Sequence, residues 1–364
     1  MSPSLTAWSA QGYINLVDHE QQAKARLSAG VWAYLQGGAG DEHTLRANAS
    51  AWQGITLWPR VLKTSEQTHT RIFLLGREWP TPLLIAPMAH QALVHSQGEM
   101  GTALAAAAQG VGMVLSAKAN STLEDVARST LSDPGRGPLW FQAYPMVDRQ
   151  HLLDLMRRAH AAGYEALVLT VDAPVQGVRD QERRNPIAWP SHVQAVNLMP
   201  YGIKTAGTWA QCLKEAPRWS DVQWLIENAP LPVLLKGITH PEDARMAVSV
   251  GARGVIVSNH GGRILDGMPS SAEALPAVVR AVAGAIPVLV DGGIRRGTDV
   301  LKAMTMGATG VLLGRSVLYG LANGGALGVA HVLRLLLDEL QMAMALTGSH
   351  DLECQPGLWR TTRR

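Results

Sequence analysis

Polar and charged side chains that could do chemistry follow short apolar runs at several places in this 364-residue chain. The most informative group is SNHGGR, in which His260 stands before a glycine pair and Arg263. A histidine transfers protons near neutral pH, and a neighbouring guanidinium binds an anion. Asp172 ends another apolar run and could stabilise the imidazolium by a hydrogen bond; capping the next segment is its alternative role. These residues predict an acid/base pair beside an anionic substrate.

Two groups of glycine and arginine residues predict a phosphate site. Gly292 and Gly293 precede Arg295, and Gly314 precedes Arg315. Paired glycines let backbone N–H groups approach an anion closely, and arginines add positive charge. Ordinary glycine turns with solvated arginines are the alternative for either group alone, but two such groups together favour a phosphate.

Lys236 ends an apolar run, and a lysine buried there needs an anion or a catalytic purpose. A structural salt bridge is one reading. Beside a phosphate site, an ammonium facing an electron-rich ring is the other, and we favour it.

Continuous apolar runs define the elements that must position these side chains. Several runs follow a helix-like segment and a glycine suited to a left-handed helix end. A continuous rather than alternating run is typical of a parallel strand covered on both faces. Eight strands are predicted, over residues 83–86, 112–116, 139–143, 166–171, 233–236, 254–258, 288–291 and 310–314.

Eight strands with helix-like segments between them predict an α/β protein with a closed (β/α)8 or TIM barrel. The clearest helical segments are 98–109, 150–162, 241–250, 272–282 and 298–306. An open doubly wound sheet is less favoured, because no glycine fingerprint opens its first strand–helix turn. Barrel chemistry gathers at the carboxyl ends of the strands, where this chain has Pro87, Met88, Ala89, Ser116, Gln142, Tyr144, Thr170, Asp172, Lys236, Ser258, His260, Arg263, Asp291, Arg295, Gly314 and Arg315.

The remaining sequence is expected to decorate one domain that spans residues 1–364. We predict a helical lead-in over 1–80, a barrel over 81–320 and a C-terminal helix and tail over 321–364. A long insertion after strand four, at about 180–218, is expected to be a lid or a binding loop. Most tryptophans lie in the lead-in and around this insertion, which favours a packing role for them.

Composition excludes several classes of protein. A net charge of +3 is too weak to indicate nucleic-acid binding. The most apolar stretch, 103–117, is too short and interrupted for a membrane span. The two cysteines form no CxxC motif, so neither a zinc site nor a disulfide scaffold is expected. With no signal-peptide pattern at the start, a cytoplasmic protein is the expectation.

The chain resembles the FMN-dependent α-hydroxy-acid oxidases and dehydrogenases, which include glycolate oxidase, lactate oxidase and mandelate-type enzymes. The resemblance runs from Tyr34 to Arg315 and into the final helix. It rests on the segments AYLQGGAGDEHTLRANASAW, PLLIAPMA, FQAY, LTVDAP, LLKGI, VSNHGGRILDG and VDGGIRRGTDVLKAMTMGATGVLLGR.

The resemblance implies FMN as cofactor and a small (S)-2-hydroxy acid as substrate. The implied cofactor-binding residues are Ala86, Pro87, Met88, Ala89, Ser116, Gln142, Thr170, Lys236, Ser258, Asp291, Gly292, Gly293, Arg295, Gly314 and Arg315. Arg263 and Arg179 would bind the substrate carboxylate with help from Tyr34, and Tyr144 would face the hydroxyl. His260 would take a proton while the α-hydrogen passes to flavin N5, whether as hydride or from a carbanion. The family also implies a homotetramer.

The resemblance leaves the electron acceptor and the substrate open. Dioxygen is the first choice as acceptor, giving H2O2, and a quinone or a protein is the second. Lys118 stands where glycolate oxidases usually have tryptophan, and it could meet a second anionic group. Gln176, Val178 and Ile264 depart from the family as well, which predicts a more polar pocket.

A flavin-free barrel isomerase or aldolase acting on a phosphorylated substrate is the alternative from another class. In that enzyme Lys236 would be a Schiff-base nucleophile. The colour of the purified protein separates the two possibilities.

Overall fold

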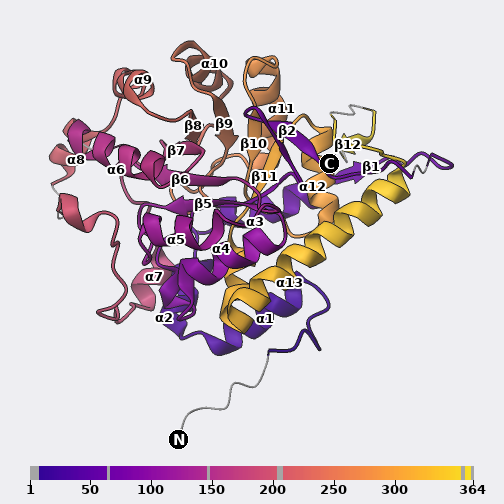
Figure 1. Cartoon of the computed structure of the whole chain (residues 1–364), viewed down its shortest axis with the longest axis horizontal. Coiled ribbons are helices and arrows are strands. Elements are labelled where there is room, and N and C mark those ends of the chain that lie inside the picture. Colours follow the sequence, from indigo (N-terminus) through magenta and orange to yellow (C-terminus); the bar gives the residue numbers. More distant parts are fainter. Residues whose placement is uncertain (1–7, 64–65, 146–147, 203–207, 354–356, 362–364) are drawn as a thin grey trace, which may run out of the picture.

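Eight parallel strands close into a barrel in the computed structural model, which describes residues 8–63, 66–145, 148–202, 208–353 and 357–361 (Figure 1). The strands are β4 (Leu83–Ile85), β5 (Gly112–Ser116), β6 (Leu139–Ala143), β7 (Ala166–Thr170), β8 (Val233–Lys236), β9 (Gly254–Val257), β10 (Val288–Val290) and β11 (Gly310–Leu313). They pair in chain order, and β11 closes the barrel against β4. The predicted fold class is therefore confirmed, and each strand ends within one residue of its predicted boundary.

Helices cover the outside of the barrel. They are α4 (Gly98–Ala108), α5 (Leu123–Thr130), α6 (Arg149–Ala161), α9 (Trp219–Asn228), α10 (Pro241–Ser249), α11 (Ser271–Val282), α12 (Gly297–Thr305) and α13 (Arg315–Thr347). The patterns that predicted five of these helices did not reveal α5 or α9. Both helices begin with a capping hydrogen bond whose residues are recognisable in the sequence. Thr122, before α5, accepts from the Asp125 N–H, and Asp221, in the first turn of α9, accepts from the Arg218 N–H.

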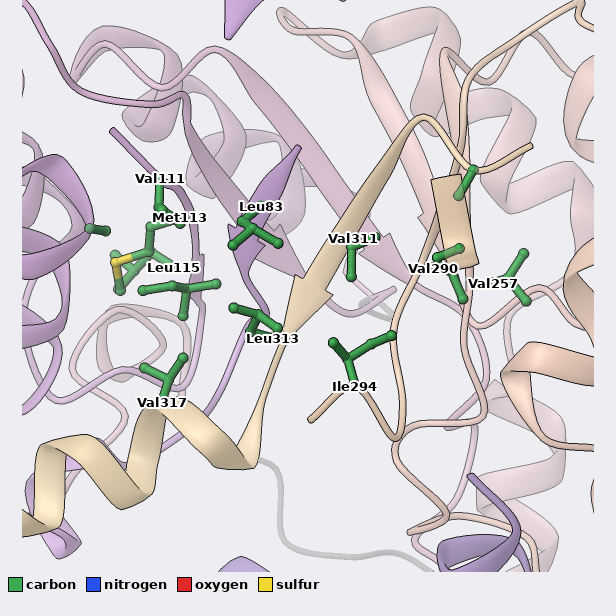
Figure 2. Close-up of a cluster of buried hydrophobic side chains, with 14 of the residues drawn as sticks. Leu83, Val111, Met113, Leu115, Val257, Val290, Ile294, Val311, Leu313 and Val317 are labelled. Atoms are coloured by element: carbon green, nitrogen blue, oxygen red, sulfur yellow. The ribbon is translucent and has the colours of Figure 1, made fainter. Parts of the chain in front are cut away.

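Each strand sends alternate side chains to the two sides of the barrel wall. Figure 2 shows part of the outer layer, where Met113 and Leu115 of β5 and Val311 and Leu313 of β11 lie with Val317 of α13. The inner layer contains Leu84, Val114, Trp140, Val168, Leu234, Ile256, Leu289 and Leu312, one from each strand. Both layers are apolar, which explains why the strand sequences are continuous runs.

Small elements close the lower end of the barrel and tie down the chain ends. The hairpin of β2 (Ile72–Leu74) and β3 (Arg77–Trp79) places Leu74 and Trp79 against the inner layer. The Trp79 ring meets Trp140 edge-on at 5.2 Å. The lead-in supplies α1 (Leu16–Arg26), α2 (Ala29–Gln36) and α3 (His43–Gln53), and its β1 (Ile55–Leu57) pairs with β12 (Trp359–Thr361).

The segment after β7 and the final helix complete the decoration. The predicted insertion contains α7 (Asp180–Arg184), η2 (Met199–Tyr201) and α8 (Trp209–Glu215). α13 starts well before the segment that predicted it and is kinked at Gly324 and Gly325. It packs on α1, α4 and α12. By length and composition α13 could cross a membrane, but 61% of its most apolar window is buried in the fold, as in a core helix.

A histidine pair joins α1 to α13, and its buried member, His19, makes stability depend on pH. His19 is fully buried, and its Nε2 lies 2.9 Å from Nδ1 of His331. Burial and the neighbouring His331 lower the pKa of His19 to about 4, against the opposing effect of Asp18. A depressed histidine pKa means that the unfolded chain takes up the proton first as pH falls below 6.5.

We therefore expect unfolding free energy to fall by on the order of 2 kcal/mol between pH 7 and pH 4.5 through His19 alone. Urea unfolding of wild type and His19→Gln at both pH values measures this contribution. The variant should be less stable at pH 7 but should lose less stability on acidification. An equal loss in both proteins would contradict the assignment.

Candidate active site

A ring of mostly polar side chains stands at the carboxyl mouth of the barrel, one layer above the apolar interior. Each member lies two residues after an inward-facing apolar residue, so alternation along the strand points it inward too. This ring, which we call the inner ring, consists of Ala86, Ser116, Gln142, Thr170, Lys236, Ser258, Asp291 and Gly314. All eight were predicted as cofactor-binding residues, and the closed barrel brings them together from eight separate strands.

One half of this ring is a neutral hydrogen-bonded chain. Ser116 Oγ donates to Gln142 Oε1 over 3.1 Å, and Gln142 Nε2 donates to Thr170 Oγ1 over 3.1 Å. All three side chains are buried. These hydrogen bonds fix the orientation of the Gln142 amide. Donors and acceptors held in fixed positions suit a planar polar ligand.

The other half of the ring is charged. Lys236 Nζ lies 2.9 Å from Asp291 Oδ2 and donates to Ser258 Oγ over 2.8 Å. Burial lowers the pKa of Lys236, but the carboxylates of Asp291 and Asp172 outweigh it and hold the pKa above its usual value. A lysine held protonated is a poor Schiff-base nucleophile, which argues against the flavin-free alternative.

His260 and Asp172 form the predicted acid/base pair. His260 Nδ1 lies 2.9 Å from Asp172 Oδ1, so the proton on Nδ1 is held by the carboxylate. The His260 N–H donates to Ser258 Oγ over 3.0 Å, and the residue has a left-handed backbone with φ of 57°. Nε2 makes no hydrogen bond within the part of the chain that the structure describes. It is therefore the nitrogen that can exchange a proton with a substrate.

Two arginines converge beside this pair. Arg263 Nη1 donates to the carbonyls of Tyr34 and Gly37 over 2.6 and 2.8 Å, and its guanidinium lies 5.4 Å from the centre of the Tyr34 ring. Arg179 Nε donates to the Arg263 carbonyl over 3.3 Å. Burial, then the charge of Arg179, lowers the pKa of Arg263, so this corner favours the arrival of an anion.

Glu182 holds both arginines, and sequence reasoning missed it. Its Oε1 accepts from Arg263 Nη2 over 3.0 Å and from Arg179 Nη1 over 3.2 Å. The spacing from Arg179 to Glu182 on one helical turn was a usable signal. Arg179 Nη2 and Arg263 Nε have no hydrogen bond among the described residues, and these two nitrogens remain for a substrate carboxylate.

The predicted phosphate end lies where β10 and β11 finish. α13 begins at Arg315 directly after Gly314, and among the described residues no side chain caps its first N–H groups. A Cβ on Gly314 would meet open space, so a ligand can approach the backbone there. Arg295 reaches Ser316 Oγ and the Tyr319 hydroxyl over 3.1 and 3.3 Å. A helix N-terminus beside an arginine is a suitable phosphate site.

Arg315, which was predicted to bind the phosphate, also links two parts of the backbone. Its nitrogens donate to the carbonyls of Leu35 and Gly261, each over 3.0 Å, so it joins α2 to the loop after β9. Burial, followed by the charge of Arg263, lowers the pKa of Arg315 to about 10. An anion bound nearby would relieve this repulsion.

Gly293 shows how closely the lead-in presses on this end of the barrel. Its φ is 81°, and a Cβ would run into the Asn48 carbonyl of α3. We expect Gly293→Ala to lower the unfolding free energy by at least about 1–2 kcal/mol and to weaken cofactor retention. Thermal unfolding and release of the expected cofactor measure both effects. The exposed Gly135→Ala is the control; equal behaviour of the two variants would refute the argument.

The pocket rim is aromatic and basic. Lys118 Nζ lies 4.9 Å from the centre of the Tyr144 ring, and Trp189 meets Tyr34 edge-on at 5.7 Å. Burial raises the pKa of Tyr144, which also senses the charges of Lys236 and Asp172, so it belongs to the same site. The predicted Pro87, Met88 and Ala89 follow β4 at the same mouth and are partly exposed. By contrast, Gln176 and Val178 are exposed, so they do not make the pocket more polar.

Three features of the site fit a flavin mononucleotide. A hydrogen-bonding ring suits a flat heterocycle, and the helix start beside Arg295 suits a phosphate. The third is that Asp291 Oδ1 and Asp172 Oδ2 are buried without a protein hydrogen bond among the described residues. A bound polar ligand would give such atoms partners.

Comparisons with known proteins agree with this assignment. The model of the FMN-dependent dehydrogenase family matches residues 23–360. L-lactate oxidase of Nostoc sp. is 47% identical over 350 residues, covering 93% of this chain and 96% of that protein. Glycolate oxidase 1 of Zea mays is 40% identical over 347 residues, 93% of each chain. A crystal structure of mandelate oxidase superposes with a TM-score of 0.88 at 39% identity, covering 97% of this chain and all of that one.

Proposed function

The chain belongs to the family of FMN-dependent dehydrogenases, and from this premise we propose that it oxidises a 2-hydroxy acid to the 2-oxo acid. It is an oxidoreductase with FMN as its cofactor. The substrate assignment is based on the His260–Asp172 pair and on the two nearby arginines, each of which has one N–H group without a hydrogen bond among the described residues.

FMN would supply, at N5, an acceptor for the two electrons and the α-hydrogen that leave the substrate. The inner ring from Ser116 to Asp291 would hold its heterocycle, and Arg295 with the start of α13 would hold its phosphate. Lys236, which stays protonated, would favour the uptake of negative charge by the flavin heterocycle.

The arginines would bind and orient the substrate carboxylate. Arg179 Nη2 and Arg263 Nε can each donate to one carboxylate oxygen, while Glu182 and the backbone carbonyls fix the other nitrogens. A charge-assisted hydrogen bond contributes about 1.5–3 kcal/mol and also fixes direction. The hydroxyl-bearing carbon would then face His260.

His260 would act as the base. Nε2 takes the hydroxyl proton as the carbon is oxidised, and the imidazolium that results is stabilised by Asp172 at Nδ1. Tyr144 would donate a hydrogen bond to the same oxygen, because burial keeps its hydroxyl protonated.

Dioxygen is the proposed final acceptor. Its reduction by two electrons and two protons releases H2O2 and balances the oxidation of one alcohol to one ketone. The similarity to an L-lactate oxidase and a glycolate oxidase supports this choice over a quinone.

Anaerobic mixing of the yellow protein with (S)-lactate and other (S)-2-hydroxy acids tests the proposal. At least one acid should bleach the flavin absorbance, and aerated buffer should restore it within one turnover while H2O2 forms. If the bleached flavin is reoxidised by a quinone but not by dioxygen, then a quinone and not dioxygen is the acceptor. A flavin that no 2-hydroxy acid bleaches would overturn the function.

A further inference from the structure

Lys118 stands inside the active-site rim, and none of the described carboxylates pairs with it. Its side chain is partly buried, and its Nζ lies over the face of Tyr144 at 4.9 Å. Among the described residues it forms no ion pair. Burial, and then the charge of Arg179, lowers the pKa of Lys118. The protein therefore keeps this cation in a place that disfavours it.

The local backbone fixes where Lys118 begins. The residue comes two positions after Ser116, and its N–H donates to Ser116 Oγ over 3.1 Å. Its carbonyl accepts from the His90 N–H over 3.2 Å. The backbone is thus tied both to the inner ring and to the loop after β4. These bonds place the Cα of Lys118 at the mouth of the barrel, and the contact of its Nζ with Tyr144 shows that the side chain lies at the rim.

The neighbours of Lys118 do not supply a negative charge. His90 meets Trp189 edge-on at 5.2 Å, and burial together with Lys118 lowers the pKa of His90, so it is neutral at pH 7. Glu99 is buried on α4, where its Oε1 accepts from the Gln91 N–H, and it forms no ion pair with Lys118. Asn120, the next polar residue along the loop, is uncharged.

The pairing of the cations around the substrate singles out Lys118. Lys236 pairs with Asp291, and Arg179 and Arg263 share Glu182. Among the described residues no carboxylate forms an ion pair with Lys118. The carboxylate next to the reacting carbon would bind the two arginines, so Lys118 is the cation left for a second anionic group on the substrate.

We propose that Lys118 binds a second carboxylate on the substrate, so that the preferred substrate is a 2-hydroxy dicarboxylic acid. This inference rests on the proposed function and specifies its substrate class. Arg179 and Arg263 would hold the carboxylate next to the reacting carbon. Lys118, whose Nζ lies over the face of Tyr144, would hold the distal carboxylate at the rim.

Matched acids test the inference with the FMN-loaded protein. (S)-Malate is compared with (S)-2-hydroxybutyrate, and (S)-2-hydroxyglutarate with (S)-2-hydroxypentanoate, because each pair shares its carbon chain and differs in the distal charge. Anaerobic stopped-flow gives the second-order rate constant of flavin bleaching. In the wild type one dicarboxylate should exceed its monocarboxylate partner, and Lys118→Met should lower that dicarboxylate rate by about 10- to 100-fold while changing its partner little.

A binding readout that needs no reaction accompanies the kinetics. Succinate and butyrate perturb the flavin spectrum only by binding, and Lys118→Met should weaken succinate alone. Lys24→Met on the exposed face of α1 removes one positive charge elsewhere and should change neither readout. Retained flavin absorbance shows that each variant is folded.

The outcomes separate this inference from the function on which it rests. Monocarboxylates that bleach as well as dicarboxylates, with an equal effect of Lys118→Met on both, would overturn the role of Lys118 and leave the proposed function standing. Preference for a phosphorylated 2-hydroxy acid would overturn the dicarboxylate assignment. If no acid bleaches the flavin, the proposed function fails, and the succinate titration alone decides whether Lys118 is an anion site.

Discussion

Replacing His260 with alanine should lower turnover by about two to four orders of magnitude, while FMN stays bound. In the wild type, Nδ1 is held by Asp172 and Nε2 is left to accept the substrate proton. Alanine removes the base but leaves the inner ring and the phosphate end intact. The rate of anaerobic flavin bleaching by the best substrate measures the step directly, and the yellow colour of the purified variant reports cofactor retention.

Two further variants make this prediction specific. Asp172→Asn should slow the same step, because an amide stabilises the imidazolium less than a carboxylate does. His151→Ala, on the outer helix α6, should leave the rate unchanged. A His260→Ala rate within about tenfold of the wild type would exclude His260 as the base.

Continuous apolar runs made the barrel predictable from sequence. The runs around Val114, Val168 and Ile256 are apolar on both faces because one face lines the barrel and the other meets helices. A strand buried on both sides has no alternation to blur its ends. The polar residue that follows most of these runs therefore marks the mouth, and the sequence alone placed Gln142 and Lys236 there.

The supporting residues were harder to predict because their partners are distant in sequence. Glu182 becomes informative only when the loop after β9 brings Arg263 to it. His90 belongs to the rim because Trp189 folds back over it, and nothing in its own neighbours indicates this. At the kink of α13, a Cβ on Gly324 would meet Trp8 of the lead-in, and a Cβ on Gly325 would meet Gln97. Such contacts are set by tertiary packing, which local patterns do not encode.

Replacing Lys236 with methionine should destabilise the FMN-loaded protein by about 3–5 kcal/mol, because Asp291 would then be a buried charge without a partner. The same change removes the donor to Ser258 Oγ, which also accepts the His260 N–H. Removing the Lys236 ammonium is therefore also expected to disturb the position of His260, the proposed base. Urea unfolding measures the stability, and the rate of flavin release measures the hold on the cofactor.

The double variant Lys236→Met/Asp291→Asn separates charge from packing. Removing both charges should restore most of the lost stability, since a neutral amide is far cheaper to bury than an unpaired carboxylate. Flavin bleaching should nevertheless stay slow, because no cation remains in the inner ring. Full recovery of the bleaching rate would show that Lys236 serves stability alone. If the double variant is as unstable as Lys236→Met, then the unpaired Asp291 is not the cause of the loss.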